Sequence, residues 1–398
     1  MRITDIKVAI FDKHPIVRIL TDEGISGYGQ VEFWKPYLKP QILSLRERLI
    51  GLDPTNVESV MRRIRFRGAF KPFGSAVSAV EMACWDIAGK AANVPVYKLL
   101  GGKVRDRVRV YNGGRRFPFT GYNPEDYAAD LQKMMASPEG FTIIKQPISF
   151  HSPMAREIPD YHYGEVPTKR YHGLRDTGPM TEKGLQHTIE CVKAMKEVAG
   201  DKIGLALDCG PGWTLPDAKR FARAVEPLNL LWLEDMLTGD QIPYVNADVY
   251  RDLTTSTTTP IHTGEQIYLR QNFKELIEKQ AVSILGPDPC DVGGIAELKW
   301  IAEYADLHGL LFAPHGTANG LFGLAALVQV SATLPDNYIA FECPIAEPEW
   351  WNTIVTGFET PLVQNGFIEV WDRPGMGVEF IPEEARRYLG EDEKDFFD

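Results

Sequence analysis

The most constraining feature of this chain is a regular succession of acidic and histidine residues, each placed at the end of an apolar run. These residues are Asp208, Glu234, Glu265, Asp288, His315 and Glu342. Successive members are 26, 31, 23, 27 and 27 residues apart, close to the length of one strand–helix unit. In a (β/α)8 barrel all parallel strands end on one face, where the βα loops build the active site. The spacing therefore predicts that these side chains surround a single mouth, and it indicates an enzyme.

Strand-like apolar runs alternate with helical segments from about residue 106 to residue 345, which favours a parallel sheet covered by helices. We expect RVRVYNGG to form the first barrel strand and FTIIKQP, ending near Lys145, the second. Residues 1–105 contain strand patterns, a DEG turn and the long helical pattern SAVSAVEMACWDIAGKAA. The chain has 398 residues, enough for a barrel of about 250 residues and a smaller domain. Residues 346–398 are predicted to return to the N-terminal domain.

One strand–helix unit is much longer than the others, because 63 residues separate Lys145 from Asp208. Its excess, about 148–180, is rich in Pro, His, Tyr, Arg and Gly and has no clear periodicity. A long loop at such a place is more often functional than idle. Two interpretations stay open, a contribution to the site and a polar loop at a subunit contact. The acidic end, EDEKDFFD, is expected to be a solvated terminus.

The composition narrows the class of protein. A net charge of −11 argues against a nucleic-acid partner, because phosphate binding needs a clustered positive field. No apolar run approaches the roughly 20 residues of a membrane span. The first residues, MRITDIKVAIFDKH, alternate like a strand and not like a signal peptide. The five cysteines are widely spaced and include no CxxC pair, which favours reduced thiols and a cytoplasmic protein.

Three of the strand-end carboxylates, Asp208, Glu234 and Glu265, follow consecutive predicted strands. Three carboxylates with room for water and a substrate oxygen suit octahedral Mg²⁺. They do not suit zinc, which prefers histidine and cysteine in a closed tetrahedron. The competing interpretation is that each acid pairs with a surface lysine or caps a helix, but that would not place all three in register. The sequence therefore predicts a magnesium site.

Several motifs together resemble those of the enolase superfamily, specifically the mandelate racemase subgroup and its acid-sugar dehydratases. They are TDEGISGYG, VEMACWDIAGKAANVPVYKLLGG, the Asp–Glu–Glu series and RPGMGVEF, and the resemblance covers nearly the whole length. It implies a (β/α)7β modified TIM barrel with an α+β capping domain built from both chain termini. It also implies Mg²⁺ and abstraction of the proton α to a substrate carboxylate.

Asp288 and His315 resemble the aspartate–histidine dyad of that subgroup. Physically, an aspartate that accepts from one imidazole nitrogen fixes the tautomer and orients the other nitrogen toward substrate. Imidazole can then abstract a proton near neutral pH and return it as imidazolium. Glu342 resembles the family glutamate that hydrogen-bonds the substrate carboxylate or developing enolate. A helix-capping aspartate, a rim histidine and a structural ion pair are the alternatives.

Lys145 marks a departure from the racemase pattern, which is Lys-x-Lys. Lys145 resembles the first lysine, which helps to hold the substrate carboxylate, but Pro147 replaces the second. Some sugar-acid dehydratases of the family place a histidine two residues after the first metal ligand, where this chain has Gly210. His315 is then the clearest acid/base group. If it serves both half-steps, elimination is syn and the product is a 2-keto-3-deoxy acid.

The resemblance also implies that two N-terminal loops contact the distal end of the substrate. These are about 12–36, with Trp34, and about 63–75, with Arg67, although ordinary surface charge explains any single residue as well. In the insertion, a tyrosine could contribute as in mannonate-dehydratase relatives, without a fixed register. The candidates there are Tyr161, His162, Tyr163, Lys169, Arg170, Tyr171 and His172.

The sequence thus predicts an Mg²⁺-dependent dehydratase that acts on a sugar acid, an aldonate or an aldarate. A racemase or epimerase of the same subgroup is one alternative, and a non-catalytic binding protein on the same barrel is another. The expected partners are a small-molecule sugar acid and further copies of the chain in a homo-oligomer, up to an octamer. No nucleic acid and no membrane are expected.

Overall fold

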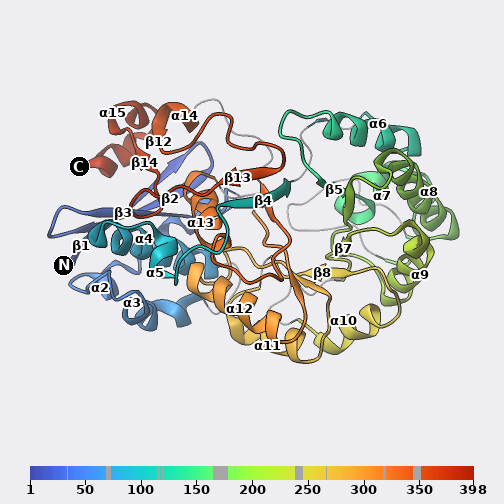
Figure 1. The fold of residues 1–398 in the computed structure, drawn as a ribbon, viewed down its shortest axis with the longest axis horizontal. Coiled ribbons are helices and arrows are strands. Elements are labelled where there is room, and N and C mark those ends of the chain that lie inside the picture. Colours follow the sequence, from blue (N-terminus) through green and yellow to red (C-terminus); the bar gives the residue numbers. More distant parts are fainter. Residues whose placement is uncertain are drawn as a thin grey trace.

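The computed structural model describes residues 1–33, 35–68, 73–113, 117–118, 120–164, 178–237, 245–265, 267–316, 320–343 and 351–398. Figure 1 shows a barrel and, beside it, a smaller α+β part that holds both chain ends. Among the described residues, no helix has the length and apolar character needed to cross a membrane.

Parallel strands form the barrel wall. They are β4 (Arg107–Asn112), β5 (Ile143–Pro147), β6 (Gly204–Asp208), β7 (Trp232–Glu234), β8 (Ile261–Thr263), β9 (Ile284–Leu285), β10 (Leu311–Phe312) and β11 (Phe341–Cys343). Strands β5 to β10 pair in chain order, and β11 pairs with β4. Two contacts close the ring. Phe312 forms a bridge with Tyr338, and Asn112 Nδ2 donates to the carbonyl of Lys145 while the amide of Lys145 donates to Asn112 Oδ1. The predicted modified TIM barrel is therefore confirmed.

Helices between the strands cover the outside of the barrel (Figure 1). They are α6 (Pro124–Met135), α8 (Glu182–Ala199), α9 (Leu215–Val225), α10 (Ala247–Thr254), α11 (Arg270–Glu278), α12 (Ile295–Leu307) and α13 (Leu321–Ser331). Inside the barrel, buried side chains in or next to all of the strands except β8 pack together, in keeping with the filled interior of this architecture. They are Tyr111, Ile143, Ala206, Trp232, Ile284, Ala313 and Ala340.

The smaller part is built on an antiparallel sheet of β1 (Ile3–Phe11), β2 (His14–Thr21) and β3 (Ser26–Gln30). The long helix α4 (Gly74–Ala92) packs on β3 so closely that a Cβ at Gly27 or Gly29 would collide with backbone of α4. This contact explains the glycines of the SGYGQ strand. Shorter helices complete this part: α1 (Lys39–Leu43), α2 (Arg46–Leu49), α3 (Val57–Ile64) and α5 (Val96–Leu99).

The C-terminal segment contacts both parts. Strand β13 (Phe367–Glu369) pairs antiparallel with β4, and β12 (Val355–Thr356) pairs with β14 (Glu379–Phe380). Asp86 of α4 accepts hydrogen bonds from the backbone amides of Met376 (2.8 Å) and Tyr28 (3.0 Å), which ties β3, α4 and this segment together.

The prediction of a solvated acidic terminus was wrong in part. Within Glu391–Phe397, a 3₁₀ helix, Glu393 is buried and pairs with Lys39 at 2.5 Å. Phe396 is buried as well and packs edge-on against Phe11. Charge alone suggested a free tail, whereas the aromatic residues at its end bury enough apolar surface to anchor it.

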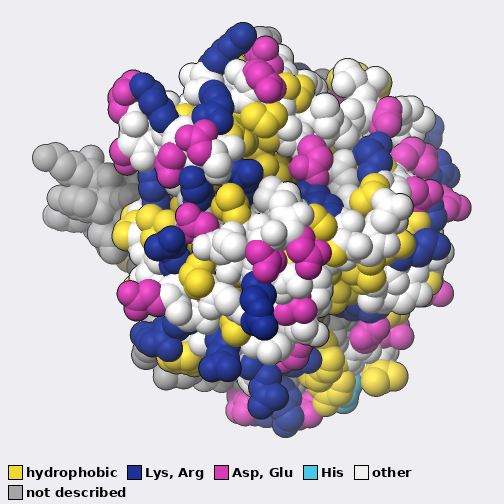
Figure 2. All heavy atoms as spheres, turned by 90° about the vertical axis from the view of Figure 1, so that its left-hand side faces the viewer, with side chains coloured by type: hydrophobic (Ala, Val, Ile, Leu, Met, Phe, Trp, Pro, Cys, Tyr) yellow, Lys and Arg dark blue, Asp and Glu magenta, His cyan; other side chains and the backbone are white. Residues whose placement is uncertain are grey.

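Figure 2 shows the face of the molecule that holds the two chain ends. Basic and acidic side chains are interspersed over it, with apolar side chains between them. No extended surface of one sign forms among the coloured residues of this face.

Candidate active site

The residues predicted at the strand ends lie at the carboxyl-terminal ends of the barrel strands. Asp208 and Glu234 are the last residues of β6 and β7, and Glu342 lies in β11. Glu265, Asp288 and His315 follow β8, β9 and β10 by two or three residues. Because the strands are parallel, all of these side chains share one end of the barrel.

Lys145 is the cation at the centre of this end. Its Nζ lies 2.6 Å from Glu234 Oε1, 3.0 Å from Glu342 Oε1 and 3.6 Å from Asp208 Oδ2. Burial by itself would lower the pKa of this lysine, but the carboxylates of Glu234 and Glu342 raise it well above its ordinary value. Lys145 is therefore a fixed positive charge between three carboxylates.

Asp288 and His315 form a hydrogen-bonded pair. Asp288 Oδ2 lies 2.6 Å from His315 Nδ1, and the backbone amide of Cys290 donates to Asp288 Oδ1 at 2.6 Å. The other imidazole nitrogen, Nε2, lies 3.3 Å from both Glu265 and Glu342. Asp288 thus fixes the ring, and Nε2 is directed at the group of carboxylates.

The pKa of His315 depends on these neighbours. Burial alone would lower it, but the carboxylates of Glu265 and Glu342 and the hydrogen bond to Asp288 together raise it well above its ordinary value. The imidazole of His315 is therefore protonated over a wider pH range than a free histidine. A change in the charge of Glu265 or Glu342 would change the pKa of His315.

The donor set fits a divalent cation in its charge and chemistry. Ligand atoms of Glu234, Asp235 and Glu265 lie within 4.8 Å of one another. Burial and the neighbouring carboxylates raise the pKa of Glu234 to about 8, although Lys145 opposes this. Glu234 is therefore fully ionised near neutral pH only when further positive charge lies close to it. A set of oxygen donors alone suits a hard cation such as Mg²⁺.

This group of acids differs from the predicted ligand set at one position, where Asp235 stands in place of Asp208. Asp235, which the sequence analysis did not single out, lies in the group, and its Oδ1 accepts a hydrogen bond from Thr263 at 2.6 Å. Asp208 lies outside the group and contacts Lys145 and His151. Asp235 is adjacent to the predicted ligand Glu234, and the strand spacing does not show which of two adjacent acids faces the metal site.

A second layer of buried groups holds Glu234. Its Oε2 accepts a hydrogen bond from Trp232 Nε1 at 2.9 Å and lies 3.3 Å from His262 Nδ1. Burial lowers the pKa of His262 to about 3, so this ring is neutral at ordinary pH. The ring stacks on Trp232 with centroids 5.3 Å apart. Glu234 is thereby fixed in position.

The N-terminal part contributes a buried ion cluster beside the dyad. Lys35 Nζ contacts Glu32 at 2.6 Å and Asp291 at 2.5 Å, and Ser75 also hydrogen-bonds Asp291. Polar atoms of Glu32, Asp288 and His315 lie within 4.8 Å of one another. Burial and the charge of Asp291 raise the pKa of Glu32 to about 8. The loop that was predicted to contact substrate therefore reaches the dyad through Glu32.

The other predicted residues have different placements. Arg67 is exposed, with its guanidinium 4.9 Å from the Phe66 ring centroid. Trp34 lies outside the described residues, as do Lys169, Arg170, Tyr171 and His172 of the insertion. Tyr161 is buried and hydrogen-bonds Ser149 and Thr188, both at 2.7 Å, so it supports the loop. Tyr163 is exposed.

His151 is a residue that the sequence analysis missed. It ends the short 3₁₀ helix η3 (Ser149–His151) after β5, and its Nδ1 lies 3.2 Å from Asp208 Oδ1. Its only sequence signal was membership of the His-rich insertion that follows strand FTIIKQP.

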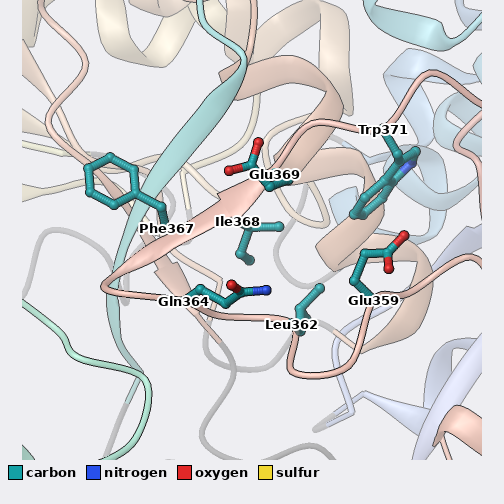
Figure 3. A pocket seen from close by; sticks show the side chains of 7 residues that line it. All are labelled: Glu359, Leu362, Gln364, Phe367, Ile368, Glu369 and Trp371. Carbon is teal, nitrogen blue, oxygen red and sulfur yellow. The ribbon is translucent and has the colours of Figure 1, made fainter.

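A surface hollow beside β13 lies apart from these groups (Figure 3). The side chains around it are Glu359, Leu362, Gln364, Phe367, Ile368, Glu369 and Trp371. They include none of the predicted catalytic or metal-binding residues. We therefore assign the chemistry to the strand ends and not to this hollow.

Comparison with known proteins gives matches over both parts of the chain. Residues 8–101 match the mandelate racemase / muconate lactonizing enzyme N-terminal domain, and residues 127–385 match the enolase C-terminal domain-like family. D-xylonate dehydratase of Haloferax volcanii is 32% identical over 384 residues, 94% of this chain and 86% of the relative. D-galactonate dehydratase of Variovorax paradoxus is 30% identical over 381 residues, 91% of this chain and 87% of the relative.

Among solved structures, a crystal structure of a mandelate racemase/muconate lactonizing enzyme-like protein from Rubrobacter xylanophilus superposes with a TM-score of 0.81. The two sequences are 29% identical, and the match covers 98% of each chain. The whole fold, including the N-terminal and C-terminal segments, thus has a counterpart.

Proposed function

Because the chain belongs to the mandelate racemase / muconate lactonizing enzyme family of the enolase superfamily, we propose that it is a hydro-lyase that dehydrates a sugar acid. The substrate is an aldonate or an aldarate, and the product is the 2-keto-3-deoxy acid. The dehydratase names of the two curated relatives support this proposal. The observation that carries it is the dyad of His315 and Asp288, directed at carboxylates and a lysine that can hold a substrate carboxylate.

Glu234 and Glu265, which lie in one group, would hold Mg²⁺ in this enzyme together with Asp208, the register partner of Glu234 across the paired strands β6 and β7. When bound, Mg²⁺ stabilises the negative charge that develops on the substrate carboxylate as the neighbouring carbon loses its proton. Lys145 supplies a second fixed positive charge at the same place, and Glu342 a hydrogen-bonding carboxylate. Such charges act strongly here because both side chains are buried.

His315 would take the proton from C2 of the substrate. Its Nε2 faces the site, while Asp288 holds Nδ1 and thereby fixes which nitrogen accepts the proton. Glu265 contributes to the raised pKa of this imidazole. When Glu265 binds a divalent cation, its carboxylate raises the pKa of His315 less. The neutral imidazole is then populated near neutral pH, where it can abstract a proton efficiently.

We also propose that the enzyme works as a homo-oligomer in the cytoplasm. The described cysteines are free and buried, in keeping with a reducing compartment. Light scattering on the purified protein would give the number of copies directly.

The proposal is tested by incubating the protein with a library of aldonic and aldaric acids and Mg²⁺. 2-Keto-3-deoxy products are then detected by their semicarbazone absorbance. We expect at least one acid to react, and we expect EDTA and His315→Asn each to abolish the signal. Deuterium incorporation at C2 without loss of water would instead indicate a racemase or epimerase. Silence across the library from folded, Mg²⁺-binding protein would contradict the proposal and favour a binding protein.

A further inference from the structure

His151 and Asp208 form a second histidine–aspartate pair at the active-site end of the barrel. His151 Nδ1 lies 3.2 Å from Asp208 Oδ1, and the side chain of His151 is 32% exposed. The side chains of Lys145, Asp208 and His315 are much less accessible, at 3%, 11% and 10%. Among these groups His151 is therefore the most accessible to solvent.

The loop that carries His151 is held rigidly. The His151 amide donates to the carbonyls of Ile148 (3.1 Å) and Cys209 (3.2 Å), so the loop lies on the end of β6. Ser149 and Phe150, the two residues before His151, are buried. Tyr161 donates to Ser149 from below, at 2.7 Å. A side chain on a loop held in this way has a defined position relative to the strand ends.

Gly210 leaves the space that His151 uses. A Cβ at Gly210 would lie 2.7 Å from the Cβ of His151 and 2.9 Å from its backbone nitrogen. Gly210 also has a φ of +60°, which disfavours other residues. The sequence at the end of β6 is thus compatible with the approach of His151, and a larger residue there would displace it.

His151 follows β5 and His315 follows β10, so the two histidines reach the barrel mouth from strands that are not neighbours in the ring. A line of contacts connects them: His315 Nε2 to Glu342 (3.3 Å), Glu342 to Lys145 (3.0 Å), Lys145 to Asp208 (3.6 Å) and Asp208 to His151 (3.2 Å). In the ring of strands, β5 and β10 are separated by β6, β7, β8 and β9 on one side and by β4 and β11 on the other. A substrate that Lys145 holds between these strands would meet His315 from one side and His151 from the other.

We propose that His151 is the general acid of the reaction. This inference rests on the proposed function. After His315 has taken the C2 proton, the electron pair of the enediolate forms the C2=C3 double bond and the C3–O bond breaks. His151 gives its proton to the departing oxygen, which leaves as water. The enol that remains tautomerises to the 2-keto-3-deoxy acid. His151 ends neutral and His315 protonated, and exchange with solvent restores both. Proton and hydroxyl leave from opposite faces, in contrast to the syn elimination expected for a single histidine.

The test uses a leaving group that needs no proton. Wild-type protein, His151→Asn and the matched control His308→Asn are assayed with Mg²⁺ on D-xylonate and D-galactonate and on their 3-deoxy-3-fluoro analogues. His308 follows helix α12, away from the strand ends. Water loss is followed through the keto product and fluoride release with an electrode. Calorimetry gives the Mg²⁺ affinity of each protein.

We expect His151→Asn to lower the dehydration rate by on the order of 10²- to 10⁴-fold. Fluoride release and Mg²⁺ affinity should stay within a few-fold of wild type, and His308→Asn should match wild type throughout. Equal losses with both leaving groups, a large loss of Mg²⁺ affinity, or no loss at all would overturn the assignment. If wild type dehydrates neither aldonate, the three proteins are compared on the acid that the library screen identifies. If no acid of the library reacts, the proposed function fails, and this assignment falls with it.

Discussion

The two histidine–aspartate pairs at the barrel mouth differ in how tightly they are enclosed. His315 is 10% exposed and 2.6 Å from Asp288, whereas His151 is 32% exposed and 3.2 Å from Asp208. Removing a proton from carbon requires a base of fixed orientation in a dry site. Protonating a departing hydroxyl requires access to the place where water leaves. The difference suggests that enclosure, and not residue type, separates the two roles.

The pairs also differ in what supports them. The Asp288 loop is held by the N-terminal part, since Glu81 of α4 accepts the amides of Ile295 (2.8 Å) and Ala296 (3.0 Å) at the start of α12. The His151 loop is held by the insertion through Tyr161. Changes in the N-terminal part should therefore affect proton abstraction, and changes in the insertion should affect departure of the hydroxyl.

The largest effect is expected for His315→Asn. Without the imidazole no other described group is placed to take the C2 proton, so we expect dehydration to fall by on the order of 10⁴-fold. Exchange of the substrate C2 proton with D₂O, followed by NMR, should be lost to the same extent. Retained exchange would show that another base acts on this face.

A smaller loss is expected for Asp288→Asn. Because the amide oxygen accepts from the backbone amide of Cys290, the NH₂ group faces Nδ1 and favours the tautomer with the proton on Nε2. Nε2 is then less often the free base, and the rate should fall about 10²- to 10³-fold. Because the bond to Asp288 raises the pKa of His315, the acidic limb of kcat/KM should move to lower pH. A change confined to KM would contradict this role.

The affinity for Mg²⁺ should rise with pH by about ten-fold per unit up to about pH 8. Below that value the cation must displace the proton of Glu234, whose pKa is raised to about 8. The same raised pKa stabilises the metal-free fold at low pH, and this contribution is lost as the pH rises toward 8. Isothermal calorimetry from pH 6 to 9 measures the affinity, and a flat profile would contradict the coupling.

The smallest effect is expected for Tyr161→Phe. The change removes hydrogen bonds to Ser149 and Thr188 beneath the His151 loop, worth about 1 kcal/mol of stability. Dehydration should fall a few-fold while C2 exchange is unchanged. Tyr163→Phe is the control, since Tyr163 is exposed. A loss of exchange in Tyr161→Phe would mean that the two loops are not independent.

The barrel and the Asp288–His315 pair were predictable from sequence for a simple reason. Parallel strands bring residues at their ends to one face, so spacing alone places Glu234, His315 and their neighbours together. The contact of Lys145 with Glu234 also follows, because β5 and β7 both flank β6.

The pair of His151 and Asp208 was not predictable in this way. It depends on how the insertion returns to β6 and on the absence of a side chain at Gly210, which no periodicity encodes. The cluster of Glu32, Lys35 and Asp291 was missed for the same reason, since it joins two parts of the chain across a tertiary contact. Asp235 shows a third limit, because spacing does not choose between adjacent acids.

The most direct test of the division between the two histidines is the fate of the C2 proton in His151→Asn. The variant is incubated with Mg²⁺ and D-xylonate or D-galactonate in D₂O, and the recovered substrate is analysed by NMR. We predict that the substrate gains deuterium at C2 through His315 while little water is lost. If exchange at C2 and loss of water fall together in this variant, the two histidines do not divide the reaction and the account is wrong.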